Sequence, residues 1–141
     1  MIRCIFHDID AGHQDRCLFE LVEDAYERRE KVLIFVRSEE RAASLDRTLW
    51  IMKQEAFIPH KIFGPHESRS QVPVGIVTVE NNPMEARILI ADAHCGLDFA
   101  CGFDTVHEFV NRSSPEIQEA CRERFRFYRT RKIPVEHLKT S

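Results

Sequence analysis

The sequence has no apolar run long enough to cross a membrane. Its longest run, 31–36, is roughly a third of the ~20 residues that a membrane-spanning helix needs. The first residues also lack the basic and then apolar segments of a secretory signal. We therefore expect a soluble protein of the cytoplasm.

Cysteines are few and scattered, and no two of them form a C-x-x-C pair. An odd set without paired spacing indicates reduced thiols rather than a disulfide framework or a structural zinc site. The sequence also lacks a Walker loop, a G-x-G-x-x-G turn and a G-x-S-x-G elbow. We therefore expect neither a cofactor nor a metal. The five cysteines are Cys4, Cys17, Cys95, Cys101 and Cys121.

What the sequence contains suits one domain that spans residues 1–141. Of its 141 residues, 43% are hydrophobic and 30% are charged. The net charge of −3 conceals an uneven distribution, because 1–30 carries eight acids and four bases, whereas 122–132 carries six bases and one acid. So dense a basic stretch indicates either an anionic partner or a solvated helix face.

Periodicity predicts an α/β fold with a mostly parallel sheet flanked by helices. Residues 3–7 form a short strand pattern, 14–29 repeat apolar residues at helical spacing, and 31–36 read as a central strand covered on both faces. A strand, a helix and a second strand in succession favour parallel pairing.

Later segments extend this pattern to five or six strands and about three main helices. Ser38 can cap a helix whose inward positions include Met52, and Ser114 followed by Pro115 begins a last helix that ends near Tyr128 or Arg129. The segment 64–73 is polar and rich in turn residues, which indicates a loop. The other inward positions of the first of these helices are Ala42, Leu45 and Leu49, and the further strands are 75–80, 87–91 and 105–110.

Asp8 and Asp10 follow the first strand, at the edge where open α/β sheets bind ligands. A D-x-D pair there resembles the first motif of haloacid-dehalogenase-type phosphohydrolases, which would imply magnesium-dependent chemistry. No later motif of that family is present. The alternative is that both acids belong to a loop start or a helix cap.

Three segments resemble the second RecA-like domain of superfamily 2 helicases: 31–45, 62–69 and 88–106. That resemblance implies a mononucleotide-binding-like fold. The arginine-rich final motif is missing, because 109–114 contains no H-R-x-G-R. A nucleic-acid-binding module that uses the basic helix directly is therefore a second alternative, without the nucleotide motifs of a motor.

A further resemblance covers nearly the whole chain. Leu45-Asp46-x-x-Leu49-Trp50, Phe57-Ile58-Pro59-His60 and the block from Ala120 to Arg129 are similar, in order and spacing, to the chi subunit of bacterial DNA polymerase III holoenzyme. This resemblance implies a non-catalytic adaptor of the clamp-loader assembly in DNA replication, with an accessory role in repair left open. Its partners would be the acidic C-terminal tail of single-stranded DNA-binding protein and the small psi subunit. It would meet DNA only indirectly.

By position, the resemblance implies that Arg122 clamps the tail carboxylate and that Phe125 belongs to the same pocket. At helical spacing these residues form one stripe that can offer a guanidinium beside an aromatic floor. An alternative for Phe125 is ordinary core packing. Gln118 stands where family members can have lysine. The full predicted set is Val110, Asn111, Gln118, Arg122, Phe125 and Arg129.

Trp50, Phe57 and Pro59 form a second candidate surface. A tryptophan beside an irregular Phe-x-Pro-His segment is either the lid of a core or an anchor for a partner. The resemblance favours docking of a psi-like subunit at this surface.

Overall fold

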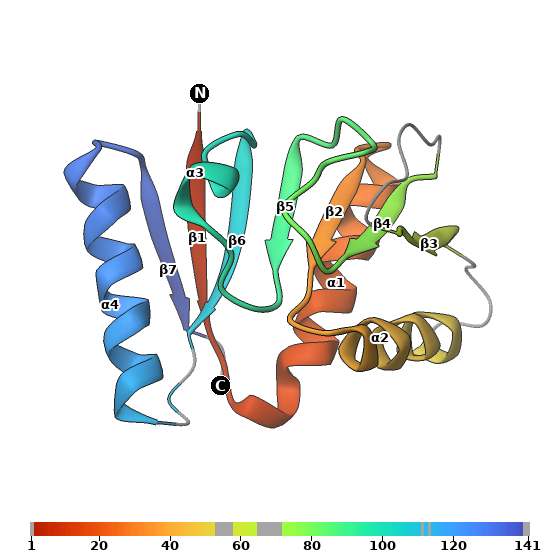
Figure 1. Cartoon of the computed structure of the whole chain (residues 1–141), viewed down its shortest axis with the longest axis horizontal. Coiled ribbons are helices and arrows are strands. Elements are labelled where there is room, and N and C mark those ends of the chain that lie inside the picture. Colours follow the sequence, from red (N-terminus) through yellow and green to blue (C-terminus); the bar gives the residue numbers. More distant parts are fainter. Residues whose placement is uncertain (1, 53–57, 65–71, 111, 113, 140–141) are drawn as a thin grey trace.

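The computed structural model describes residues 2–52, 58–64, 72–110, 112 and 114–139, which form a sheet of seven parallel strands (Figure 1). The strand order is β3-β4-β2-β5-β6-β1-β7. The strands are β1 (Arg3–Asp8), β2 (Val32–Phe35), β3 (His60–Ile62), β4 (Val74–Val77), β5 (Ile88–Ala91), β6 (Thr105–Val110) and β7 (Val135–Lys139). The helices are a 3₁₀ turn η1 (Ala11–His13), α1 (Gln14–Glu27), α2 (Glu39–Met52), α3 (Leu97–Ala100) and α4 (Pro115–Thr130).

The predicted α/β class with a parallel sheet is confirmed. Alternate residues of each strand face opposite sides, so the sheet carries two separate apolar clusters. One cluster packs α1 and α2 against the sheet through residues such as Leu18 and Leu45. The other packs α3 and α4 through residues such as Ala100 and Tyr128. Figure 1 shows α4 beside β7 at one end of the sheet and α2 at the other.

The sheet has more strands than the sequence predicted, because the apolar periodicity did not indicate β3 and β7. Both are edge strands with one neighbour each, and their side chains are mostly exposed. They therefore lack the continuous apolar pattern of the central strands. The strand predicted at 75–80 is also shorter, because β4 ends at Val77.

Met52 does not face inward as predicted. It is 38% exposed, because the last turn of α2 lies outside the cluster that buries Ala42, Leu45 and Leu49. Most of the predicted loop 64–73 lies outside the described residues. In the described part of the chain, no helix is both long and apolar enough to span a bilayer.

Helix α4 is fastened to the sheet by a buried ionic cluster. Arg124 donates from Nε to Glu108 Oε1 at 2.6 Å and from Nη2 to Glu108 Oε2 at 2.9 Å. Tyr128 donates its hydroxyl proton to the same carboxylate at 2.6 Å, and Arg124 Nη1 donates to the carbonyl of Cys95 at 2.6 Å. Burial and the Glu108 charge raise the pKa of Tyr128, which keeps this hydroxyl a donor.

Replacing Arg124 should destabilise the protein strongly. The variant Arg124→Met leaves the carboxylate of Glu108 buried without its cation, so we expect a loss of about 3–5 kcal/mol in the free energy of unfolding. Urea denaturation measures this loss. The control Arg126→Met, an exposed arginine of the same helix, should cost less than about 1 kcal/mol. Equal losses in the two variants would show that the cluster does not anchor α4.

A second buried pair makes stability depend on pH. His7 Nε2 and His107 Nδ1 lie 2.9 Å apart on the α1 side of the sheet, and both rings are nearly inaccessible. Burial, with a smaller effect from His7, lowers the pKa of His107 from 6.5 to about 3, and burial also lowers the pKa of His7. The folded state thus keeps the pair neutral at a pH where the unfolded chain takes up protons.

Acid should therefore begin to weaken the fold near pH 6.5, above the range in which ordinary carboxylates titrate. Stability should be constant above about pH 6.5 and fall as the pH drops towards 4.5, by about 1.4 kcal/mol per pH unit for each proton that only the unfolded state binds. Urea midpoints across this range measure the slope. His107→Leu should flatten it, whereas His13→Leu, at an exposed position, should not. A wild-type slope of zero would contradict this account.

Candidate functional site

A hollow of about 430 Å³ lies between α4 and the adjoining strands. Four residues of the predicted tail-binding set line it: Val110, Gln118, Arg122 and Phe125. Asn111 lies outside the described residues. The remaining lining residues, which the sequence did not single out, are Phe6, Arg112, Cys121 and His137.

The start of α4 sets the direction of this lining. The hydroxyl of Ser114 accepts the N–H of Ile117 at 3.2 Å, and Pro115 occupies the first turn, as the sequence predicts. From this fixed start, side chains spaced by three or four residues share one face of the helix. The stripe formed by Gln118, Arg122 and Phe125 therefore runs along the hollow.

Phe125 forms the apolar floor of the hollow. Its ring is half-buried and lies 5.5 Å from the ring of Phe6, measured between centroids. Arg129 lies over the other side, with Cζ 5.7 Å from the Phe125 centroid. Phe125 also packs against the buried cluster that contains Tyr128. The ring of Phe125 therefore packs on the core, as the alternative predicted, and also lines the hollow.

Arg122 is the exposed cation at the rim. Its side chain is 66% exposed, and its guanidinium lies 3.5 Å from Glu119, an acid that Arg126 holds more closely at 2.9 Å. Arg126 in turn keeps the pKa of Glu119 below its usual value. The charge of Arg122 is thus only loosely compensated, and its guanidinium can reach a second anion.

Arg112 and His137 bring further basic groups to the same hollow. Arg112 makes two hydrogen bonds to the carboxylate of Asp8, and His137 Nε2 lies 3.2 Å from Asp8 Oδ2. Arg112 lowers the pKa of Asp8. The sequence analysis singled out Asp8 but did not predict this group, because Asp8, Arg112 and His137 meet only through the pairing of β1 with β6 and β7.

This geometry does not favour the phosphohydrolase hypothesis. Asp8, the first acid of the D-x-D pair, is held by Arg112, while Asp10 is exposed and lies 3.9 Å from His13. Across the described ranges, no cluster of three or more His, Cys, Asp or Glu side chains is arranged to hold a metal ion. None of the five cysteines forms a disulfide.

The carboxyl edge of the sheet, where related folds bind ligands, has its own hollow of about 600 Å³. Its most buried cation is already neutralised: Arg41 donates to Asp92 through Nε and Nη2, each at 2.8 Å, and to Asp15 at 2.5 Å. Gln14 also donates to Asp92. An internal ion-pair network thus occupies the place that a nucleotide takes in such folds.

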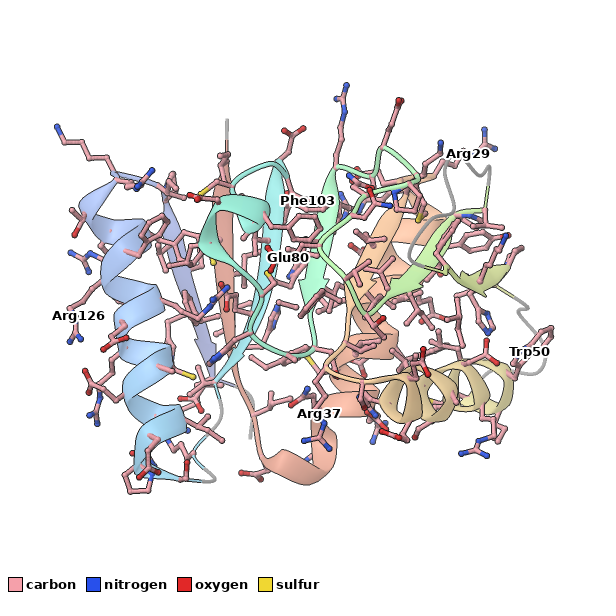
Figure 2. The ribbon with its side chains drawn as sticks, viewed as in Figure 1. Arg29, Arg37, Trp50, Glu80, Phe103 and Arg126 are labelled. Atoms are coloured by element: carbon pink, nitrogen blue, oxygen red, sulfur yellow. The ribbon has the colours of Figure 1, made fainter. Side chains whose placement is uncertain are left out.

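The second candidate surface lies at the far end of α2. Trp50 is 51% exposed, and its ring packs at a steep angle against the ring of His60, with centroids 5.1 Å apart. Ile51, Met52 and Ile62 are also exposed. Pro59 is half-buried, and Phe57 lies outside the described residues. Figure 2 shows Trp50 and Arg126 of α4 at opposite ends of the molecule.

Comparison with solved structures defines the class of fold. The C-terminal domain of the DEAD-box protein Dbp5 superposes with a TM-score of 0.61 at 14% identity, covering 98% of this chain and 90% of that chain. A variant S. cerevisiae Dbp5 C-terminal domain bound to Gle1 and IP6 gives a TM-score of 0.62 at 14% identity, over 99% and 90% of the two chains. The fold is therefore that of a RecA-like helicase C-terminal domain.

Comparison of sequences gives the family. The family model described as DNA polymerase III chi subunit, HolC, matches residues 1–136. DNA polymerase III subunit chi of Escherichia coli K12 is 30% identical over 116 residues, which cover 82% of this chain and 78% of that protein. The Pseudomonas aeruginosa subunit chi is also 30% identical, over 82% and 79%. The chain belongs to the DNA polymerase III chi subunit family, which confirms the resemblance and gives it a role in DNA replication.

Proposed function

We propose that this chain is a non-catalytic adaptor of the clamp-loader assembly. The hollow beside α4 binds the acidic C-terminal tail of single-stranded DNA-binding protein. The second candidate surface, which contains Trp50 at the end of α2 and which we call the α2 surface, binds a psi-like subunit. The observation that carries the proposal is the exposed guanidinium of Arg122 beside an apolar hollow floored by Phe125. Such a site suits a peptide that ends in an apolar residue and a free carboxylate.

Each part of the hollow has a place in this recognition. Arg122 donates charge-assisted hydrogen bonds to the terminal carboxylate. The rings of Phe6 and Phe125 bury the last apolar side chain of the tail. Arg112, although engaged by Asp8, adds positive potential where Gln118 carries no charge. Upstream acids of the tail are attracted to Arg129 at the far end of the stripe.

The basic helix is less suited to direct nucleic-acid binding than its composition indicates. Arg124 is buried and neutralised by Glu108, and Arg122 and Arg126 share Glu119. Three of the six bases counted in 122–132 thus have internal acidic partners. The helix therefore presents a local pocket for the end of a peptide rather than a continuous cationic face.

The α2 surface supports the second interaction. Trp50, Ile51 and Met52 at the end of α2 and Ile62 in the edge strand β3 are exposed large apolar side chains. Exposed aromatic and aliphatic groups of this kind serve as anchors in protein interfaces. Because this surface and α4 lie at opposite ends of the molecule, one chain can hold both partners at once (Figure 2).

Tail binding should depend on Arg122. We expect a fluorescent acidic peptide ending in Pro-Phe to bind the wild type and to bind Arg122→Ala at least about tenfold more weakly, because a charge-assisted contact is lost. Phe125→Ala should also weaken binding, as should deletion of the peptide's terminal residue. Arg126→Ala on the same helix is the matched control and should change affinity little. Equal affinity of Arg122→Ala and wild type would refute the site.

Docking of the psi-like subunit should depend on Trp50. We expect Trp50→Ala to weaken co-purification and measured affinity for a psi subunit by about tenfold or more, because the anchor ring is removed. Tyr26→Ala, at an exposed aromatic on α1, should leave this affinity unchanged. Arg122→Ala should also leave it unchanged. If Trp50→Ala weakened binding of the tail peptide instead, the assignment of the two surfaces would be wrong.

A further inference from the structure

The amino edge of the sheet carries a cluster of basic side chains that the proposed adaptor role does not use. They surround a hollow of about 590 Å³ on the opposite edge from the Arg41–Asp92 network. Figure 2 shows Arg29 at this edge and Arg37 at the other. The basic residues that line the hollow are Arg3, Arg28, Arg29, Lys31 and Arg87, and we call them the amino-edge cluster.

The register of the sheet sets these side chains in a row. Val32 pairs with Ile88, Ile88 with Thr105, and Thr105 with Arg3, so β2, β5, β6 and β1 begin at the same level. Lys31 precedes β2, Arg87 precedes β5 and Arg3 opens β1. Three strand intervals of about 4.8 Å make this row about 14 Å long, far longer than one phosphate group.

The end of α1 adds two arginines above the row. Glu30 N–H donates to the carbonyl of Ala25, and Arg29 N–H donates to that of Tyr26, which is the Schellman pattern of a helix end. Arg29 takes the position where glycine is usual and has a φ of 60°.

Part of the cluster's charge is uncompensated. Three acids also line the hollow, of which Glu30 pairs with Arg28 at 2.9 Å and Asp104 lies 3.9 Å from Arg87. The third is Glu85. Over the described part of the chain, Arg3, Arg29 and Lys31 form no ion pair with a carboxylate. Asp24, which lies outside the lining, also pairs with Arg28 at 2.9 Å, so the five bases face four acids and keep an excess of one positive charge.

We propose that the amino-edge cluster binds the sugar–phosphate backbone of nucleic acid. A row of about 14 Å is long enough to face several successive phosphates of one strand. Guanidinium forks suit phosphate oxygens. The lining contains no aromatic ring on which a base could stack, and its aliphatic residue Ile88 is buried, so it offers no pocket for a peptide side chain. Contact is therefore with the backbone and independent of base sequence.

This contact is weak and would add to tethering by single-stranded DNA-binding protein. The chain would then meet DNA directly at the amino edge, in addition to its indirect link through the tail. The proposal does not rest on the tail site, because the two sites share no residue.

Fluorescence anisotropy with the full-length chain and a labelled mixed-sequence oligonucleotide, single-stranded and as a duplex, tests the proposal. At low salt we expect binding whose logarithmic dependence on salt has a slope of about −2 for the single strand, as three phosphate contacts predict. Arg29→Gln/Lys31→Gln should weaken binding about tenfold and reduce the magnitude of that slope by about 1.4, because two of the three contacts are lost. The matched control Arg37→Gln/Arg47→Gln removes the same charge from exposed positions elsewhere and should retain binding.

Several results would overturn the proposal. One is failure of the wild type to bind the oligonucleotide at low salt, and another is equal weakening of binding in the two double variants. A third is that polyglutamate displaces the labelled oligonucleotide as well as unlabelled oligonucleotide does, which would assign the cluster to an acidic protein segment. The acidic tail peptide should bind Arg29→Gln/Lys31→Gln as it binds wild type. Failure of the tail site and failure of the amino-edge cluster are thus distinguishable.

Discussion

The buried contact of Glu108 with Arg124 and Tyr128 governs the rest of the functional surface. A carboxylate with no solvent exposure is tolerable only when cation and hydroxyl satisfy it fully, and here each of its oxygens accepts a hydrogen bond. Because Arg124 and Tyr128 must both face β6, they fix the rotation of α4 about its axis. The stripe from Gln118 to Arg129 then has to lie along the adjoining hollow.

The order of the strands separates the proposed partners in space. β7 and α4 close one end of the sheet, whereas β3 and the end of α2 close the other. A continuous hydrogen-bonded sheet between them makes a stiff spacer, so one bound partner does not displace the other. The amino edge is a third surface, distinct from both ends and opposite the edge that related folds use for ligands.

Sequence predicted the central elements well and the periphery poorly. The strand around Ile34 and the helix around Leu18 carry strong apolar patterns because both lie inside the clusters. The strand around Leu138 has no such pattern, because an edge strand packs on one neighbour and faces solvent. At the candidate site, helical spacing and the family resemblance identified Arg122 and Phe125. Nothing local could indicate His137, which joins the hollow through long-range strand pairing.

By itself, the sequence determined the α/β class and the membership of the chi subunit family, because hydropathy periods and short motifs are properties of neighbouring residues. Only the tertiary structure decided which charges are available to a partner. Six bases in 122–132 look equivalent along the chain, yet Arg124 is buried against Glu108 while Arg122 stands at the rim of a hollow. The physical reason is that burial and pairing depend on what the sheet brings opposite each side chain, and that partner can lie far away in sequence.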